Sequence, residues 1–149
     1  MNKAIVFTKP GRDTMTIKYP QEAARLEGET DEAFLQRIIE KEIPQELHAS
    51  CVIVDIKDIP NTRENRNAWK VEGGKVQVDQ AKAKEIHKER LLAKAEEKME
   101  DALRKEAWGD GKESSERREL KTWAAGLDAD LSTIQTVEEL VQYEPEFLN

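Results

Sequence analysis

Cysteine and histidine are scarce in this chain of 149 residues, which contains only Cys51, His48 and His87. A single cysteine cannot form a disulfide within the chain, so the sequence indicates a reducing compartment or indifference to redox conditions. These three residues are also too scattered for a zinc site, which needs clustered ligands. Cys51 begins the apolar run Cys-Val-Ile-Val, so we interpret it as a core residue of a buried strand rather than a nucleophile. We predict no catalytic residue, no metal site and no cofactor.

Long apolar runs are also missing. No segment approaches the roughly 20 apolar residues of a membrane span, and the N-terminal segment is too short for a signal peptide with its own apolar core. We therefore expect a soluble protein made in the cytoplasm, without a membrane partner. Hydrophobic residues make up 38% of the chain and aromatic residues 5%, so the core should be limited.

Charged residues are abundant, and acidic residues outnumber basic ones. Charged residues make up 37% of the chain, and 24 Lys and Arg against 31 Asp and Glu give a formal net charge of −7. From Lys82 to Lys105 almost every cation has a carboxylate three or four residues away, a spacing that keeps a helix soluble. Because no basic patch is separated from the acidic residues, we expect no nucleic-acid partner.

Residues 1–79 have the pattern of a small α+β unit. Short strands are expected near residues 4–7, 14–19 and 51–54, and a helix capped by Thr30 is expected to end before Pro44. Apolar residues then alternate with polar ones on both sides of Gly73-Gly74, which predicts a hairpin of two strands. Trp69 is the largest group on its apolar face. We predict that Trp69 is a buried structural anchor, packed against the helix that carries Phe34 or against the base of the following long helix.

Residues 80–149 have the pattern of a helical region. The sequence predicts one long helix of about 28 residues, a turn at Gly109-Asp110-Gly111, and a C-terminal helical hairpin. The fold class is thus α+β, with a small N-terminal sheet, one packed helix and a hairpin, followed by the long helix and the helical hairpin. The division is expected at residues 79 and 80.

The apolar residues of the long helix are predicted to lie on two faces. The first face contains Ala83 and Ile86. The second face follows a spacing of seven residues and consists of Leu92, Ala95, Met99 and Ala102, with Leu103 beside them. The second face can pack against the chain's own C-terminal helix, or it can be a seam between copies of the chain. We take Leu92, Met99 and Leu103 as candidate interaction residues.

A family resemblance is carried by three segments. Residues 65–90 contain an Asn/Arg-rich turn, an Ala-Trp strand, a Gly-Gly tip, a Val-Asp end and the helical run Lys-Ala-Lys-Glu-Ile-His-Lys-Glu-Arg. Together with residues 3–8 and 25–35, they resemble small proteins encoded among the tail and virion genes of tailed bacteriophages and prophages. The likeness covers most of the first 95 residues and returns near the C-terminus. It implies a virion-associated or tail-associated protein rather than an enzyme.

Three functions are weighed on this basis. The first is a structural or adaptor component of a bacteriophage tail or virion, which acts through contacts with other phage proteins or with copies of itself. The second is a tail-fibre assembly chaperone that is absent from the mature particle, and the third is a host-interacting regulatory protein. The protein would be made in the host cytoplasm and, if structural, would end in the virion.

Overall fold

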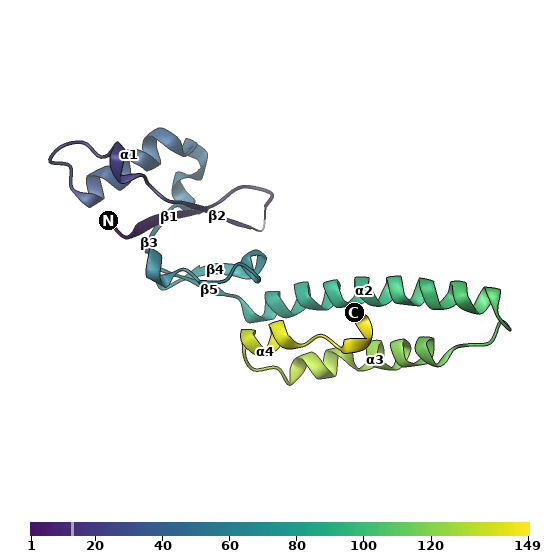
Figure 1. Ribbon diagram of the computed structural model, residues 1–149. Helices are drawn as coiled ribbons and strands as arrows, with labels where there is room; N and C mark the ends of the chain where they lie inside the picture. Colours follow the sequence, from purple (N-terminus) through teal and green to yellow (C-terminus); the bar gives the residue numbers. More distant parts are fainter. Residues whose placement is uncertain (13) are drawn as a thin grey trace. The chain divides into compact units, whose positions relative to one another are not determined.

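The computed structural model describes residues 1–12 and 14–149, which form two compact units, Met1–Asp79 (unit 1) and Gln80–Asn149 (unit 2). Each unit is described by itself. The fold is α+β, as predicted, with the strands in unit 1 and the long helices in unit 2 (Figure 1). The helices and strands are β1 (Lys3–Thr8), β2 (Met15–Lys18), α1 (Asp31–Glu42), β3 (Val52–Asp55), β4 (Trp69–Glu72), β5 (Lys75–Val78), α2 (Gln80–Trp108), α3 (Ser115–Ser132) and α4 (Val137–Gln142).

Strand β1 is the centre of unit 1. It pairs antiparallel with both β2 and β3, which gives a three-stranded sheet of order β2-β1-β3. Its residues Ala4, Ile5, Val6 and Phe7 are all buried. Because neighbouring strand residues point to opposite faces, this continuous apolar run means that both faces of the sheet are covered.

Helix α1 covers the first face. Ile5 and Phe7 of β1 pack with its buried residues Phe34, Leu35 and Ile38. The helix begins as the sequence predicts, because the Thr30 side chain accepts a hydrogen bond from the backbone N–H of Ala33 at 3.2 Å.

The hairpin of β4 and β5 covers the second face. Its tip is Gly73-Gly74, and both glycines have the positive φ angles, 59° and 75°, that a tight primed turn requires. Trp69 and Val76 of the hairpin pack with Ala4 and Val6 of β1 and with Val54 of β3. Unit 1 thus has three layers, which are helix, sheet and hairpin (Figure 1).

Trp69 is buried, with 6% of its surface exposed. Its packing partners in unit 1 come from the sheet and the hairpin, so the predicted contact with the helix that carries Phe34 is wrong. The reason is the central strand, which has an apolar side chain on each face and therefore separates α1 from the hairpin. The alternation around Gly73-Gly74 correctly identified the inner face of the hairpin but carried no information about what covers it.

An ion pair closes the loop in front of α1. The Arg37 guanidinium donates to both carboxylate oxygens of Glu29, each at 2.7 Å, and the backbone N–H of Leu26 donates to Glu29 at 3.0 Å. These hydrogen bonds, chiefly those from Arg37, lower the pKa of Glu29 from 4.5 to about 2. Arg37 also lies over the ring of Phe34, with 5.5 Å between the guanidinium carbon and the ring centroid.

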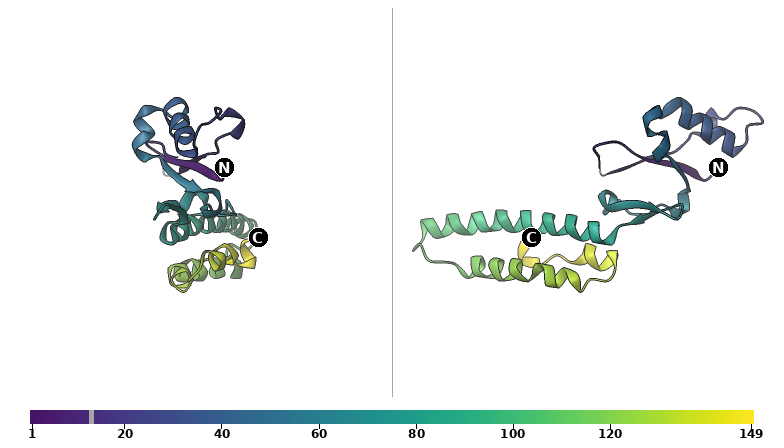
Figure 2. Two further views of the ribbon diagram at one scale, coloured as in Figure 1. Left: turned by 90° about the vertical axis from the view of Figure 1, so that its left-hand side faces the viewer. Right: turned by 180° about the vertical axis from the view of Figure 1, so that it is seen from behind.

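Unit 2 consists of α2 with α3 and α4 packed along it (Figure 2). The chain then ends in a single 3-10 turn, η5 (Glu146–Leu148), which also contacts α2. None of the helices in residues 1–12 and 14–149 combines the length and the apolar character needed to cross a membrane.

Trp69→Ala should destabilise unit 1 by about 3–5 kcal/mol, because it empties the core between the sheet and the hairpin. Thermal denaturation followed by circular dichroism measures the loss. Trp69→Phe should lose less, since it keeps an aromatic ring and gives up no hydrogen bond among the described residues. A Trp69→Ala variant that melts within a degree or two of the parent would contradict this packing.

The Glu29–Arg37 pair predicts a dependence of stability on pH. A carboxylate with a lowered pKa in the folded state stabilises that state above its ordinary pKa, and the contribution is lost as the pH falls through the lowered value. Glu29→Gln should therefore melt below the parent at neutral pH, and the difference should shrink between about pH 4.5 and about pH 2. Melting curves across this range test it, with the exposed Glu46→Gln as the control. A difference that stays constant over the range would refute the assignment.

Candidate functional site

The predicted interaction residues Leu92, Met99 and Leu103 belong to α2, and the packing of that helix determines which of its side chains are exposed. Its buried residues are Ala83, His87, Leu91, Ala95 and Ala102, which we call the seam. The first four follow a spacing of four, and the fifth lies seven residues further on, so they share one side of the helix. The seam is the side of α2 covered by α3, α4 and η5.

The structure corrects the prediction of two apolar faces on this helix. Ala83 was assigned to one face and Ala95 and Ala102 to another, yet all three lie in the seam, because α3, α4 and η5 together cover a wide arc of α2. Leu91 is fully buried and was missed, whereas its neighbour Leu92 was chosen. The spacing of four from Ala83 through His87 and Leu91 to Ala95 is the signal that could have identified Leu91.

The predicted interaction residues lie beside the seam. Leu92 is 37% exposed, Leu103 is 45% exposed, and Met99 is half-buried. Spacings of seven and four residues place these three side chains on the same flank of α2. We call them the flank strip. The alternative that the whole second face is intrachain core is therefore wrong for Leu92 and Leu103 and right for Ala95 and Ala102.

A hydrogen bond from His87 holds residues 143–149, which we call the C-terminal segment, against the seam. The Nε2 atom of His87 lies 2.7 Å from the backbone carbonyl oxygen of Tyr143, and its Nδ1 lies 3.1 Å from a guanidinium nitrogen of Arg90. A carbonyl only accepts and a guanidinium only donates, so Nε2 carries the proton and Nδ1 accepts from Arg90. Lys94 also donates to Glu144. His87 is thus a structural residue that is fully occupied within unit 2.

The C-terminal segment forms a groove with α3. The ring of Phe147 meets the ring of Trp123 edge-on, with 5.7 Å between centroids and 82° between planes. Next to this pair is a groove of about 580 Å³ lined by Ser115, Arg118, Glu119, Thr122, Trp123 and Phe147. The sequence alone did not indicate this groove, because Phe147 lies 24 residues beyond Trp123 in a short turn without periodicity.

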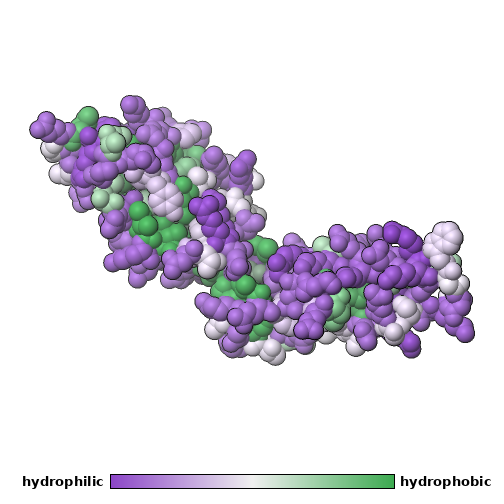
Figure 3. All heavy atoms as spheres, viewed as in Figure 1, coloured by the Kyte–Doolittle hydropathy of each residue, from purple (hydrophilic) through white to green (hydrophobic). Residues whose placement is uncertain are grey.

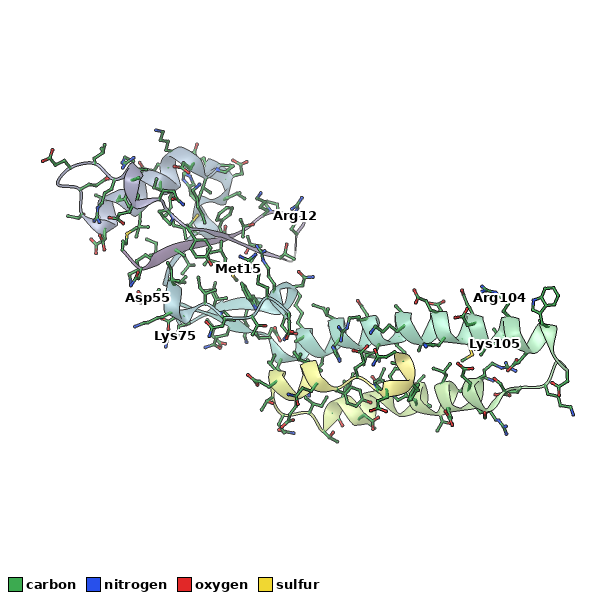
Figure 4. All side chains as sticks on the ribbon, in the orientation of Figure 1. Arg12, Met15, Asp55, Lys75, Arg104 and Lys105 are labelled. Atoms are coloured by element: carbon green, nitrogen blue, oxygen red, sulfur yellow. The ribbon has the colours of Figure 1, made fainter. Side chains whose placement is uncertain are left out.

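The turn between α2 and α3 is fixed by Glu106. Its carboxylate accepts hydrogen bonds from the backbone N–H of Ser114 at 2.6 Å and from Nε of Arg117 at 3.1 Å. These hydrogen bonds lower the pKa of Glu106, and the bond from the Ser114 backbone has the largest effect. Trp108 precedes the turn and is 89% exposed. Figure 4 shows Arg104 and Lys105 at this same end of α2.

Cys51 and His48, like His87, make contacts within the fold. The Cys51 thiol is half-buried and lies 3.5 Å from the carbonyl oxygen of Leu47, and burial raises its pKa, which disfavours the reactive thiolate. His48 Nε2 lies 2.7 Å from the carbonyl oxygen of Ile43. Among all residues other than Asp13, no group of three His, Cys, Asp or Glu side chains could hold a metal ion.

The surface of unit 2 is mostly hydrophilic on the face shown in Figure 3. Against this polar background, Leu92 and Leu103 of the flank strip and Trp108 are the exposed large apolar side chains of α2. Comparison of the chain with protein-family models, with curated proteins and with solved structures finds no match. The chemistry of these surfaces therefore supplies the argument about function.

The neighbouring residues Ala102 and Leu103 provide a direct test of the seam. Ala102 is 1% exposed, so Ala102→Leu should overpack the contact with the opposing segments and destabilise unit 2 by about 1–3 kcal/mol. Leu103→Ser removes an exposed side chain and should change stability by less than about 0.5 kcal/mol. Urea denaturation of both variants measures the two effects. Equal losses, or a larger loss for Leu103→Ser, would show that the seam is misplaced.

Proposed function

We propose that this protein is a non-enzymatic structural or adaptor component of a bacteriophage tail or virion and that it acts through protein–protein contacts. The observation that carries the proposal is the flank strip, where Leu92 and Leu103 remain exposed on a highly charged helix. The resemblance of residues 3–8, 25–35 and 65–90 to tail and virion proteins of tailed phages supplies the biological setting.

The flank strip has the character of a recognition surface. A helix that keeps apolar residues at spacings of seven and four presents them in a row, which is how amphipathic helices enter a groove or pair with another helix. Glu89 and Glu96 are exposed close to this row. A partner that combines an apolar groove with basic residues along its edge would complement both features.

Two further features support a scaffold role. The turn held by Glu106 and the C-terminal segment held by His87 give unit 2 a defined surface, and a defined surface lowers the entropy lost on binding. The groove beside Trp123 and Phe147 is lined by the polar side chains of Ser115, Arg118, Glu119 and Thr122, which can contact a partner.

Leu92→Glu combined with Leu103→Glu tests the proposal. Because both side chains are exposed, the double variant should keep the helical circular dichroism and melting temperature of the parent within a few degrees. It should nevertheless lose binding to its tail or virion partner by about tenfold or more, since two charges would enter an apolar contact. Co-purification from cells that express the neighbouring tail genes, followed by titration with the isolated partner, measures the loss.

A matched control separates a contact effect from a change in net charge. Ala93→Glu combined with Ala125→Glu adds the same two charges at exposed positions outside the flank strip. This control should bind the partner like the parent. A folded Leu92→Glu, Leu103→Glu variant that binds as tightly as the control would refute the role of the flank strip.

A further inference from the structure

A row of glutamates runs beside the flank strip on α2. Glu89, Glu96 and Glu100 each lie three residues before one member of the strip, so the two rows share the same spacings of seven and four residues. A step of three residues falls about 60° short of a full turn of the helix, so the glutamates border the strip on one side. All three side chains are exposed. We call them the acidic row.

The acidic row is not neutralised by neighbouring cations. Glu89 and Glu96 have no Lys or Arg at the positions three or four residues away, which are their neighbours on the helix surface. Arg104 lies four residues after Glu100, but it pairs with Asp101 at 3.3 Å. Among the described residues, none of the three glutamates of the row forms an ion pair.

The other cations of α2 are used to hold the fold of unit 2 together. Lys88 pairs with Asp128 of α3, Lys105 pairs with Glu116 of α3, and Lys94 and Arg90 pair with Glu144. The fold therefore pairs the cations on the covered side of α2 and leaves the carboxylates beside the flank strip unpaired. A surface that combines an exposed apolar row with an unpaired acidic row is complementary to an apolar row bordered by cations.

A second copy of the chain does not have this complementary surface. Glu89, Leu92, Glu96 and Met99 follow the alternating steps of three and four residues that place side chains at the centre of a pair of helices. In a parallel pair of copies, equivalent central positions face each other, so Glu89 would meet Glu89 and Glu96 would meet Glu96. In an antiparallel two-fold pair, both acidic rows would lie on the same side of the contact. Both arrangements bring like charges together, and the net charge of −7 on each chain adds to the repulsion.

We propose that the flank strip binds a basic amphipathic helix of a partner protein, whose Lys or Arg side chains lie against the acidic row. The apolar side chains of the strip then enter the groove between the side-chain ridges of that helix. This inference rests on the proposed function, because it names the chemistry of the partner that the flank strip contacts. It excludes a second copy of the chain as the occupant of the strip.

The expected contact is short and depends on salt. From Glu89 to Leu103 the two rows extend along about 21 Å of helix, which is roughly four turns. Charges at the border of a contact determine the choice of partner and the rate of association more than the affinity. Because the acidic row is exposed, added salt screens its attraction to the partner's cations, so binding should weaken as the salt concentration rises.

Synthetic helical peptides of about 28 residues, long enough to form a helix in water, test the proposal with the full chain. The basic peptide has a row of leucines at heptad spacing with a row of lysines beside it, and the acidic peptide has glutamates in place of those lysines. A third peptide has the composition of the first but places its lysines on the face opposite the leucines. Isothermal titration calorimetry should show that the parent binds the basic peptide about tenfold or more tightly than either of the others.

Reversing the charge of the acidic row should reverse the preference. The triple variant Glu89→Lys, Glu96→Lys, Glu100→Lys should bind the basic peptide about tenfold or more weakly than the parent and should bind the acidic peptide more tightly. Because the three side chains are exposed and form no ion pair among the described residues, circular dichroism should show a folded variant.

A matched control makes the same change in net charge elsewhere. The triple variant Glu27→Lys, Glu46→Lys, Glu64→Lys alters exposed residues of unit 1 and should bind the basic peptide within about twofold of the parent. A row reversal that binds the basic peptide as tightly as this control does, or a parent that does not prefer the basic peptide to the other two, would overturn the proposal.

Two further results separate this inference from the proposed function. If Leu92→Glu with Leu103→Glu abolishes binding to a tail or virion partner but reversal of the acidic row does not weaken it, the proposed function stands and the basic helix is wrong. If the peptides bind as expected but no tail or virion partner is found, the chemistry of the surface stands and the phage setting is wrong. Self-association of the parent in sedimentation velocity that Leu92→Glu with Leu103→Glu abolishes would identify a second copy as the occupant and would also overturn the inference.

Discussion

The packing of the buried side of α2 determines what unit 2 can present to other molecules. The seam runs through Ala83, Leu91, Ala95 and Ala102, which are nearly or fully buried against α3, α4 and η5. Small residues let these segments approach α2 closely, and the His87 contact with the Tyr143 carbonyl fixes where the C-terminal segment lies. Outside this side, the exposed large apolar side chains of α2 are Leu92, Leu103 and Trp108, and they identify the candidate surfaces.

Those surfaces lie on different sides of the same helix. The flank strip of Leu92, Met99 and Leu103 lies beside the seam, and Trp108 is exposed at the C-terminal end of α2. A helix that exposes two separate apolar features can contact two partners at once, which is what an adaptor requires.

Much of the fold could be predicted because the relevant interactions are local. The N-cap at Thr30, the primed turn at Gly73-Gly74 and the apolar run of β1 each depend on a few neighbouring residues. The partner of Trp69 could not be predicted, because the hairpin pattern is the same whether a helix or a sheet covers it. Leu91 and Leu92 are adjacent and identical in type, and only the spacing of four from Ala83 through His87 to Ala95 distinguishes Leu91 as the buried one. The groove at Phe147 depends on a contact across 24 residues for which the chain has no periodic signal.

The central claim, that this chain is a part of a phage particle, can be tested by quantifying the polypeptide in particles and in cells. Particles produced from the genome that encodes the chain would be purified, and mass spectrometry would compare the amount of the chain with that of known particle proteins. The account predicts a fixed copy number per particle that survives repeated purification. A chain that is abundant in the producing cells but absent from complete particles would contradict a structural role and would favour an assembly chaperone.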